Sequence, residues 1–247
     1  MATYNDEAVV LRTYRLGEAD RIITLLTRRH GKVRGVAKGV RRTSSKFGAR
    51  LEPFAHVDLQ ITEGRTLDIF TSVVTKTLFS KDVVDDYGRY TAAEAMVEVA
   101  DKVVSEEGIP ALQQYLLLVG ALRALCEGTT DGPRPAVVIL DSYMLRATAI
   151  AGYTPALDVC AVCGAVGPHS FFHPASGGMV CVHDRPPGAV SVAPATLAYL
   201  GALLAGDWVA TRDVPRSRMD ETSGMVAAFV NWHLERGVRS LGHVDRS

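Results

Sequence analysis

The sequence has none of the segments that mark a secreted or membrane-spanning protein. Its first residues are acidic, and they lack the basic stretch followed by an apolar one that a secretory signal needs. The best candidate for a membrane span, residues 111–126, is shorter than the roughly 18 apolar residues required. Gln113, Gln114 and Arg123 also interrupt it. We therefore expect a cytoplasmic protein.

Sequence motifs of nucleotide hydrolysis and of covalent catalysis are also missing. There is no G-x-x-x-x-G-K-[ST] loop for phosphates and no G-x-S-x-G turn for a nucleophilic serine. A zinc deaminase would show H-x-E ahead of P-C-x-x-C, and neither segment is present. The paired acids at 85–86 and 106–107 lie near expected helix ends, where capping or solvated roles are more common than catalysis. The residues favour a binding protein over an enzyme.

The total charge is uninformative, because 27 basic and 27 acidic residues cancel. The distribution of the charge along the chain is informative. Residues 1–50 contain twelve Lys or Arg and four Asp or Glu, a net charge of +8, so the remaining residues carry a net charge of −8. Such an asymmetry indicates a local surface for nucleic acid or membrane. The chain has 247 residues, 47% of them apolar, and no internal repeat, which suits one or two domains with buried cores.

Residues 1–80 have the pattern of a small β-domain. Short apolar runs are separated by turn signals, and the turn before Lys32 predicts a hairpin with Gly31 at a positive φ. Residues 57–62 alternate between apolar and polar, as in a half-buried strand. We expect strands at 8–11, 21–27, 32–39, 57–62 and 67–76. Five strands of this length predict a five-stranded β-barrel of the OB-fold type.

Basic side chains gather in the second and third expected strands and in the loop 40–51 that follows. Between Arg12 and Arg50 the only acidic residues are Glu18 and Asp20. Nearby aromatic residues are few, which predicts sequence-tolerant and salt-sensitive contacts to a phosphate backbone. We predict a nucleic-acid-binding surface that comprises Arg21, Lys32, Arg34, Lys38, Arg41, Arg42, Lys46 and Arg50.

Residues 81–247 change to a helical period. One apolar stripe includes Met96 and Val99, and another begins at Tyr115 and ends at Cys126, which we therefore expect in the core rather than at a metal. Further helices are expected at 135–151, 193–205 and 219–237. The predicted fold class is α+β and multidomain. An OB-fold nucleic-acid-binding domain at 1–80 precedes an all-helical domain at 81–247.

Residues 153–190 interrupt the helical pattern with glycines, prolines, three histidines and three cysteines. Cys160 and Cys163 form a CxxCG turn, and seventeen residues separate Cys163 from Cys181, a gap typical of the two halves of a zinc ribbon. A structural zinc needs four ligands in a tetrahedral array. We expect a zinc-ribbon-like insertion with a structural Zn²⁺ held by Cys160, Cys163, Cys181 and Asp184, with His183 as the alternative fourth ligand.

The fourth ligand and the role of the cysteines stay open at this point. The CxxC spacing favours Asp184, whereas an imidazole is the commoner zinc ligand, and His173 is a third candidate. The pair Cys160 and Cys163 could instead be redox-active, although such pairs usually lie where a strand enters a helix. An open zinc position at residue 183 or 184 would make the protein a metalloenzyme. The predominance of thiolates favours a closed structural site.

Several short motifs occur in the order and spacing of a known bacterial family. They lie at 18–27, 30–32, 36–42, 45–48, 51–54, 152–155, 160–164 and 176–178, with Cys181 after the last. No single motif is specific, but together they cover essentially the whole chain. In this combination the chain resembles the recombination mediator RecO family.

The resemblance implies an OB-fold, a helical domain with a zinc-binding insertion, and a non-catalytic role in DNA repair by the RecF pathway. Such a protein binds single- and double-stranded DNA and anneals complementary strands. It assists RecA loading on DNA coated with single-strand-binding protein, with RecR as a partner, and it is associated with the nucleoid. The chain departs from the family at Asp184, where many members have a fourth cysteine.

The residues alone also allow an alternative function. An RNA-binding factor of translation or transcription, with an OB-fold and a zinc ribbon, would share the charge pattern. Strand annealing and a preference for DNA over RNA would distinguish the two functions.

Overall fold

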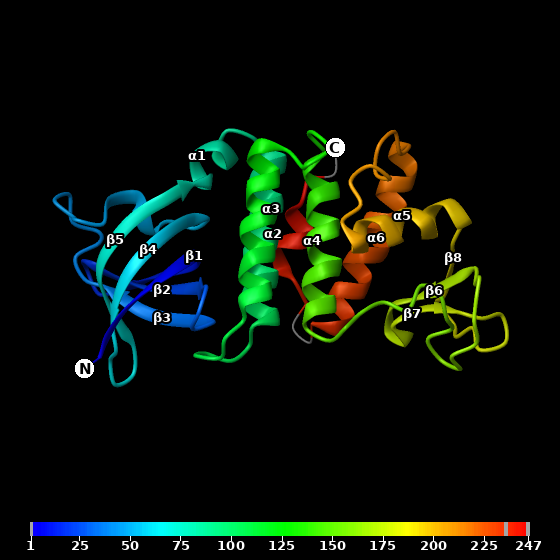
Figure 1. Ribbon diagram of the computed structural model, residues 1–247, viewed down its shortest axis with the longest axis horizontal. Helices are drawn as coiled ribbons and strands as arrows, with labels where there is room; N and C mark the ends of the chain where they lie inside the picture. Colours follow the sequence, from blue (N-terminus) through cyan, green and yellow to red (C-terminus); the bar gives the residue numbers. More distant parts are fainter. Residues whose placement is uncertain (1, 235–236, 246–247) are drawn as a thin grey trace.

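The computed structural model describes residues 2–234 and 237–245, and its N-terminal part is a closed β-barrel. Figure 1 shows the barrel at one end of an elongated molecule, helices in the middle and a small sheet at the other end. All five predicted strands are present. They are β1 (Thr3–Leu16), β2 (Asp20–Thr27), β3 (Lys32–Ala37), β4 (Ala55–Thr62) and β5 (Asp68–Leu78). Their order around the barrel is β1-β2-β3-β5-β4, and the pair β3 and β5 is parallel.

Strand β1 is much longer than the apolar run at 8–11 predicts. It has 14 residues because both of its edges are paired, the first half with β4 and the second half with β2. Polar residues such as Asn5 and Arg12 therefore join the strand through backbone hydrogen bonds and not through burial. Inside the barrel the side chains of Val10, Leu25, Val57, Ile61 and Phe70 form a separate apolar cluster with their neighbours.

The hairpin between β2 and β3 has the predicted conformation, with Gly31 at φ +65°. A second requirement for glycine was not visible in the sequence. A Cβ atom at Gly31 would overlap the carbonyl oxygen of Ile109, which lies in the loop between two helices. The backbone of the barrel and the backbone of the helical part therefore touch at this turn, and only glycine lets them approach so closely.

The helical part contains α1 (Phe79–Val84), α2 (Tyr87–Val103), α3 (Leu112–Glu127), α4 (Ala136–Ile150), α5 (Pro194–Ala205) and α6 (Arg216–His233). The predicted helices are confirmed, and α1 is an addition. Helix α4 lies between α3 and α6 in Figure 1, and its central residues are almost all buried. The last helix was predicted to reach residue 237. It ends at His233, and residues 235–236 lie outside the described residues.

The barrel and the helices share one apolar core. Val9, Leu11 and Leu26 point out of the barrel and belong to the same buried cluster as Met96 and Leu122 of the helices. At the edge of this contact, His56 Nε2 lies 2.8 Å from the Tyr115 hydroxyl. The two parts are therefore held together by apolar burial as well as by polar contacts.

A small β-module lies between α4 and α5, at the far end of the molecule from the barrel (Figure 1). It contains β6 (Phe171–His173), β7 (Gly178–Val180) and β8 (Val190–Ser191), which pair in the order β7-β6-β8. No helix in the described part of the chain is long and apolar enough to cross a membrane.

Candidate nucleic-acid interface and metal centre

The basic loop, defined here as residues 38–50, is anchored to the barrel by apolar side chains at its end. Phe47 and the adjoining Leu51 are buried in the barrel core, where the backbone forms the short helix η1 (Gly48–Leu51). At the start of the loop, the amide of Gly39 donates to the Asp20 carboxylate at 2.7 Å. One of the few acidic groups nearby is thus engaged with backbone, and the loop has a defined position.

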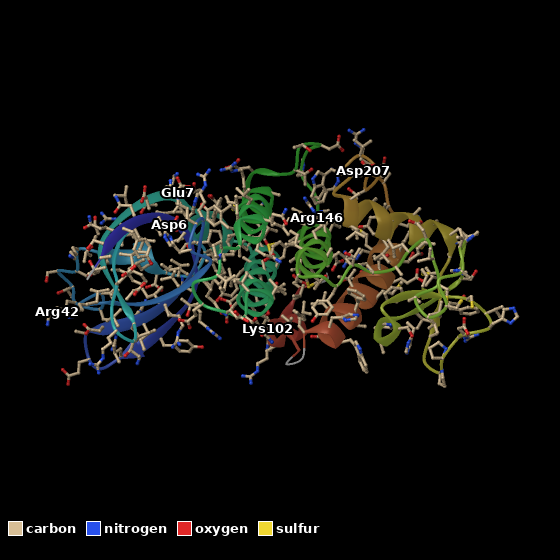
Figure 2. The ribbon with its side chains drawn as sticks, turned by 60° about the horizontal axis from the view of Figure 1, so that its bottom comes forward. Asp6, Glu7, Arg42, Lys102, Arg146 and Asp207 are labelled. Carbon is tan, nitrogen blue, oxygen red and sulfur yellow. The ribbon has the colours of Figure 1, made fainter. Side chains whose placement is uncertain are left out.

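Most of the charge on this loop has no carboxylate partner. Arg41 donates to the Glu18 carbonyl at 2.9 Å, Lys46 to the Thr71 carbonyl at 2.8 Å and Arg50 to the Lys46 carbonyl at 2.8 Å. These bonds orient the side chains without neutralising them. Among the described residues no ion pair involves these three, Lys38 or Arg42. Figure 2 shows Arg42 at the end of the barrel farthest from the helices.

The other three predicted residues have acidic partners. Arg21 lies 2.6 Å from Glu52, and Arg34 lies 3.3 Å from Glu107. The Lys32 side chain is only 10% exposed, and its ammonium donates to the carbonyl and the carboxylate of Asp101. The structure therefore places Lys32 in the contact between barrel and helices, and we leave it out of the basic surface.

The two aromatic residues near the charges have different environments. Phe47 is buried, with the Lys46 ammonium 5.2 Å from its ring centre, so its ring cannot stack on a base. Tyr14 is 47% exposed on β1, and the Arg12 guanidinium lies 5.1 Å from its ring centre. An exposed ring beside a cation can contact both a base and its phosphate.

The β-module brings the three predicted cysteines and Asp184 together. The candidate ligand atoms of Cys160, Cys163, Cys181 and Asp184 all lie within 4.8 Å of one another. The CxxC turn closes when the amide of Gly164 donates to the Cys160 carbonyl at 2.9 Å, and Gly164 has φ +75°. Cys181 directly follows β7, so the small sheet positions the second half of the cluster against the first.

The spacing of these four groups fits a tetrahedral metal ion. The sulfur atoms of Cys163 and Cys181 are 4.0 Å apart, and the Asp184 carboxylate lies 3.9 Å from the Cys160 sulfur and 3.1 Å from the Cys181 sulfur. Zn–S bonds of 2.3 Å at tetrahedral angles place two sulfurs about 3.8 Å apart. The donor set of three thiolates and a carboxylate is also one that zinc accepts.

The electrostatics of the cluster agree with a cation site. The backbone amide of Cys163, and then that of Cys181, donates to the Cys160 sulfur and lowers the pKa of that thiol to about 6. The Asp184 carboxylate raises the pKa of Cys163 to about 12, because it accepts a hydrogen bond from the protonated thiol. The Cys160 thiolate and the Asp184 carboxylate thus place negative charge close together, and a divalent cation would relieve their repulsion.

The alternative ligands from the sequence lie outside the cluster. His183 is exposed and is not among the grouped ligand atoms of the described residues. The Nδ1 atom of His173 lies 2.8 Å from the Ser176 hydroxyl and accepts from the Ser176 amide. Cys126 packs against the helical core, as predicted, and burial raises the pKa of its thiol to about 11.

A groove between α3, α4 and α5 is a feature that the sequence reading missed. Its volume is about 710 Å³, and its lining includes Leu117, Ala121, Ile139 and Leu204 beside the guanidinium of Arg146. Burial lowers the pKa of Arg146, and no ion pair or hydrogen bond of this side chain is found among the described residues. Figure 2 shows Arg146 in the middle of the helical body. One signal was available, namely that Arg146 is the only basic residue of the mostly apolar helix α4.

Comparison with known proteins places both parts of the chain in one family. Residues 1–79 match the model of the recombination protein O N-terminal region, and residues 84–242 match that of its C-terminal region. Proteins named DNA repair protein RecO are similar over their full length. Those of Cutibacterium acnes and Thermobifida fusca are each 55% identical over 100% of both chains. That of a Nocardioides species is 55% identical over 98% of this chain and 99% of its own.

The two family regions meet between residues 79 and 84, after strand β5 ends and where helix α1 lies. The basic loop lies in the first region, and the candidate metal ligands and the groove lie in the second. The chain therefore belongs to the RecO family of DNA repair and recombination proteins.

Proposed function

We propose that this protein is a non-catalytic recombination mediator that binds single- and double-stranded DNA and anneals complementary strands. The observation that carries the proposal is the basic loop, where five cations have no carboxylate partner among the residues that the structure describes. Strand annealing requires the repulsion between two phosphate chains to be screened, and such a surface does so by releasing counterions. Contacts to phosphate alone leave the base edges free to pair.

We assign a different role to each of the two parts of the fold. The barrel, residues 1–80, is the DNA-binding domain, and its strand order supports its assignment as an OB-fold. The binding residues are Lys38, Arg41, Arg42, Lys46 and Arg50, with Arg21 and Arg34 at the margin. The helical domain, residues 81–247, carries the insertion at 153–190, in which Cys160, Cys163, Cys181 and Asp184 would hold a structural Zn²⁺. Bound zinc would hold the two halves of the insertion together.

Annealing without a nucleotide cofactor tests this function directly. We expect the protein to accelerate pairing of complementary DNA oligonucleotides without ATP, and we expect the acceleration to fall steeply between 50 and 200 mM salt. A fluorescence-quenching assay with labelled strands measures the rate. Faster annealing of RNA than of DNA would instead favour an RNA-binding factor, and no acceleration at either salt concentration would refute the mediator function.

The groove around Arg146 supports a protein partner in the same pathway. This guanidinium is half-buried among apolar side chains and has no acidic partner within the described ranges. Such a group favours a ligand that brings both a carboxylate and apolar groups. We propose that this ligand is an anionic, apolar segment of single-strand-binding protein. The mediator would then reach coated DNA, bind RecR and assist RecA loading there.

Reversing the charge of Arg146 should therefore weaken binding of the protein partner without affecting DNA binding. We expect Arg146→Glu to weaken binding of single-strand-binding protein at least tenfold, while affinity for bare DNA is unchanged. Arg146→Met, which keeps the bulk, should show most of the same loss. Calorimetric titration measures both affinities, with Arg89→Glu on α2 as the control. Unchanged partner affinity in both Arg146 variants would contradict the assignment.

A further inference from the structure

A cleft of about 790 Å³ lies where the barrel meets the helical domain, and none of the described residues that line it belongs to the cysteine cluster or to the groove around Arg146. Arg12 lines it from β1, and Asp101 and Lys102 line it from the end of α2. Tyr153 lies in the turn that follows α4, and His233 is the last residue of α6. Arg239, in the C-terminal segment, lies on its rim. Segments from distant parts of the sequence thus meet in one cleft that has both aromatic and cationic side chains.

Tyr153 provides an exposed ring that is supported from behind. Its side chain is 46% exposed, and its ring centre lies 5.2 Å from that of His233. His233 in turn packs on Phe229 at 4.4 Å, and Phe229 contacts Phe172 at 6.3 Å. Both phenylalanines are buried, so the stack leads from the core to the cleft. A ring held in this way loses little freedom when a flat ligand stacks on it.

The acidic groups of the cleft are occupied by local partners. Asp101 accepts from Arg12 at 2.5 Å and from Lys32 at 3.3 Å. Glu98 accepts from the backbone of Arg239 and from Ser240, and these bonds outweigh the effect of burial and hold its pKa at about 2. Arg12 nevertheless remains 49% exposed, and the Arg239 guanidinium has no ion pair within the described ranges. The described residues that line the cleft include four cations and two carboxylates, which favours an anion.

Strand β1 connects this cleft to the basic loop. Arg12, Tyr14 and Leu16 alternate along the strand and are all exposed, and Arg41 donates to the carbonyl of Glu18 just beyond its end. Arg12 lies at the cleft, and Tyr14 lies between the cleft and the loop. Aromatic and cationic side chains along one groove are the usual contacts of a single strand.

We propose that this cleft is a second nucleic-acid contact, which holds one base of a single strand on Tyr153 and the adjoining phosphates on Arg12 and Arg239. This inference rests on the proposed function, because the strand reaches the cleft from the basic loop along β1. The shared chemistry is an aromatic base joined to a phosphate, which a free nucleotide also offers. The continuous path along β1 favours a strand.

The test compares variants of the full chain by fluorescence anisotropy with a labelled oligo-dT strand. We expect Tyr153→Ala to weaken binding roughly tenfold, the size of a lost base–aromatic stack. Tyr153→Phe should bind as the unchanged protein does, because it keeps the ring. Arg239→Glu should weaken binding and also reduce its salt dependence. Tyr87→Ala is the matched control, since Tyr87 is exposed at the start of α2, about 22 Å along the helix axis from Lys102 at the cleft.

Two further measurements identify the ligand and its place. A strand that carries photoreactive 5-iododeoxyuridine should crosslink to Tyr153, as read by mass spectrometry, and millimolar dTMP should not displace the strand. Displacement by dTMP would overturn the strand proposal in favour of a free nucleotide. Unchanged binding by Tyr153→Ala, or an equal loss in Tyr153→Phe, would overturn the stacking site.

The result for the cleft can be distinguished from the result for the proposed function. If charge reversal in the basic loop abolishes binding while Tyr153→Ala and Arg239→Glu do not weaken it, only the cleft assignment fails. If the loop variant keeps its affinity for the strand, the proposed function itself fails.

Discussion

Replacing Arg41, Arg42 and Lys46 with glutamate is expected to abolish strand annealing and to weaken DNA binding at least a hundredfold at low salt. Each phosphate contact contributes about 0.9 to the slope of log affinity against log salt. Removing three contacts should therefore lower that slope by roughly three. The fold should persist, because all three side chains are exposed and bond at most to backbone carbonyls. Affinities at four salt concentrations provide the slope.

A matched triple reversal separates the position of the charges from their sum. Lys81, Arg185 and Arg216 are exposed on the helical domain and its insertion, and changing them to glutamate alters the net charge by the same amount. We expect the control variant to bind and anneal DNA nearly as well as the unchanged protein. If the basic-loop variant kept the original salt slope, or if both variants lost equal affinity, the barrel would not be the DNA-binding surface.

Removal of the metal is expected to unfold the insertion, not to stop a chemical reaction. Phe172 and Met179 of the small sheet pack into the helical core, but the separate apolar cluster around the cysteines is very small, with Cys160, Val180 and Ala189 as its buried members. Little besides the metal would therefore hold the CxxC turn against the sheet. Zinc binding by comparable peptides contributes about 10–16 kcal/mol to folding. Chelation or Cys160→Ser should thus release one zinc per chain and increase hydrogen exchange at the amides of Ala161 and Met179, which bond across the module.

Substitutions of Asp184 and His183 test which residue is the fourth zinc ligand. We expect Asp184→Ala to weaken zinc binding and Asp184→Cys to strengthen it, because a fourth thiolate completes a set that zinc prefers. His183→Ala should have no effect, since this side chain lies outside the cluster. Metal content and competition with a chromogenic chelator measure these changes. A protein purified without zinc, or a larger loss in the His183 variant, would contradict the assigned ligands.

Local patterns in the sequence were sufficient for most of the secondary structure. Alternating residues predicted β4, the turn at Gly31 predicted the hairpin, and helical stripes predicted α2 and α3. The polar ends of β1 were missed, because they are held by partners on two other strands and not by their own burial. The CxxC spacing identified the cysteine cluster, since ligands in one turn are close in space whatever the rest of the chain does.

Sequence by itself determined the basic character of the N-terminal region and identified the three cysteines that can hold a metal, whereas the structure placed Asp184 beside them as the fourth group. Both depend on residues that are close in the chain. Only the tertiary structure decided that Lys32 pairs with Asp101, that Arg146 has no acidic partner in the part of the chain that the structure describes, and that Tyr153 shares a cleft with Arg12. The physical reason is that the ion pairs and the exposure of a side chain depend on which distant segments of the chain pack together. Local patterns determine the helices and strands, but not how those helices and strands pack against one another.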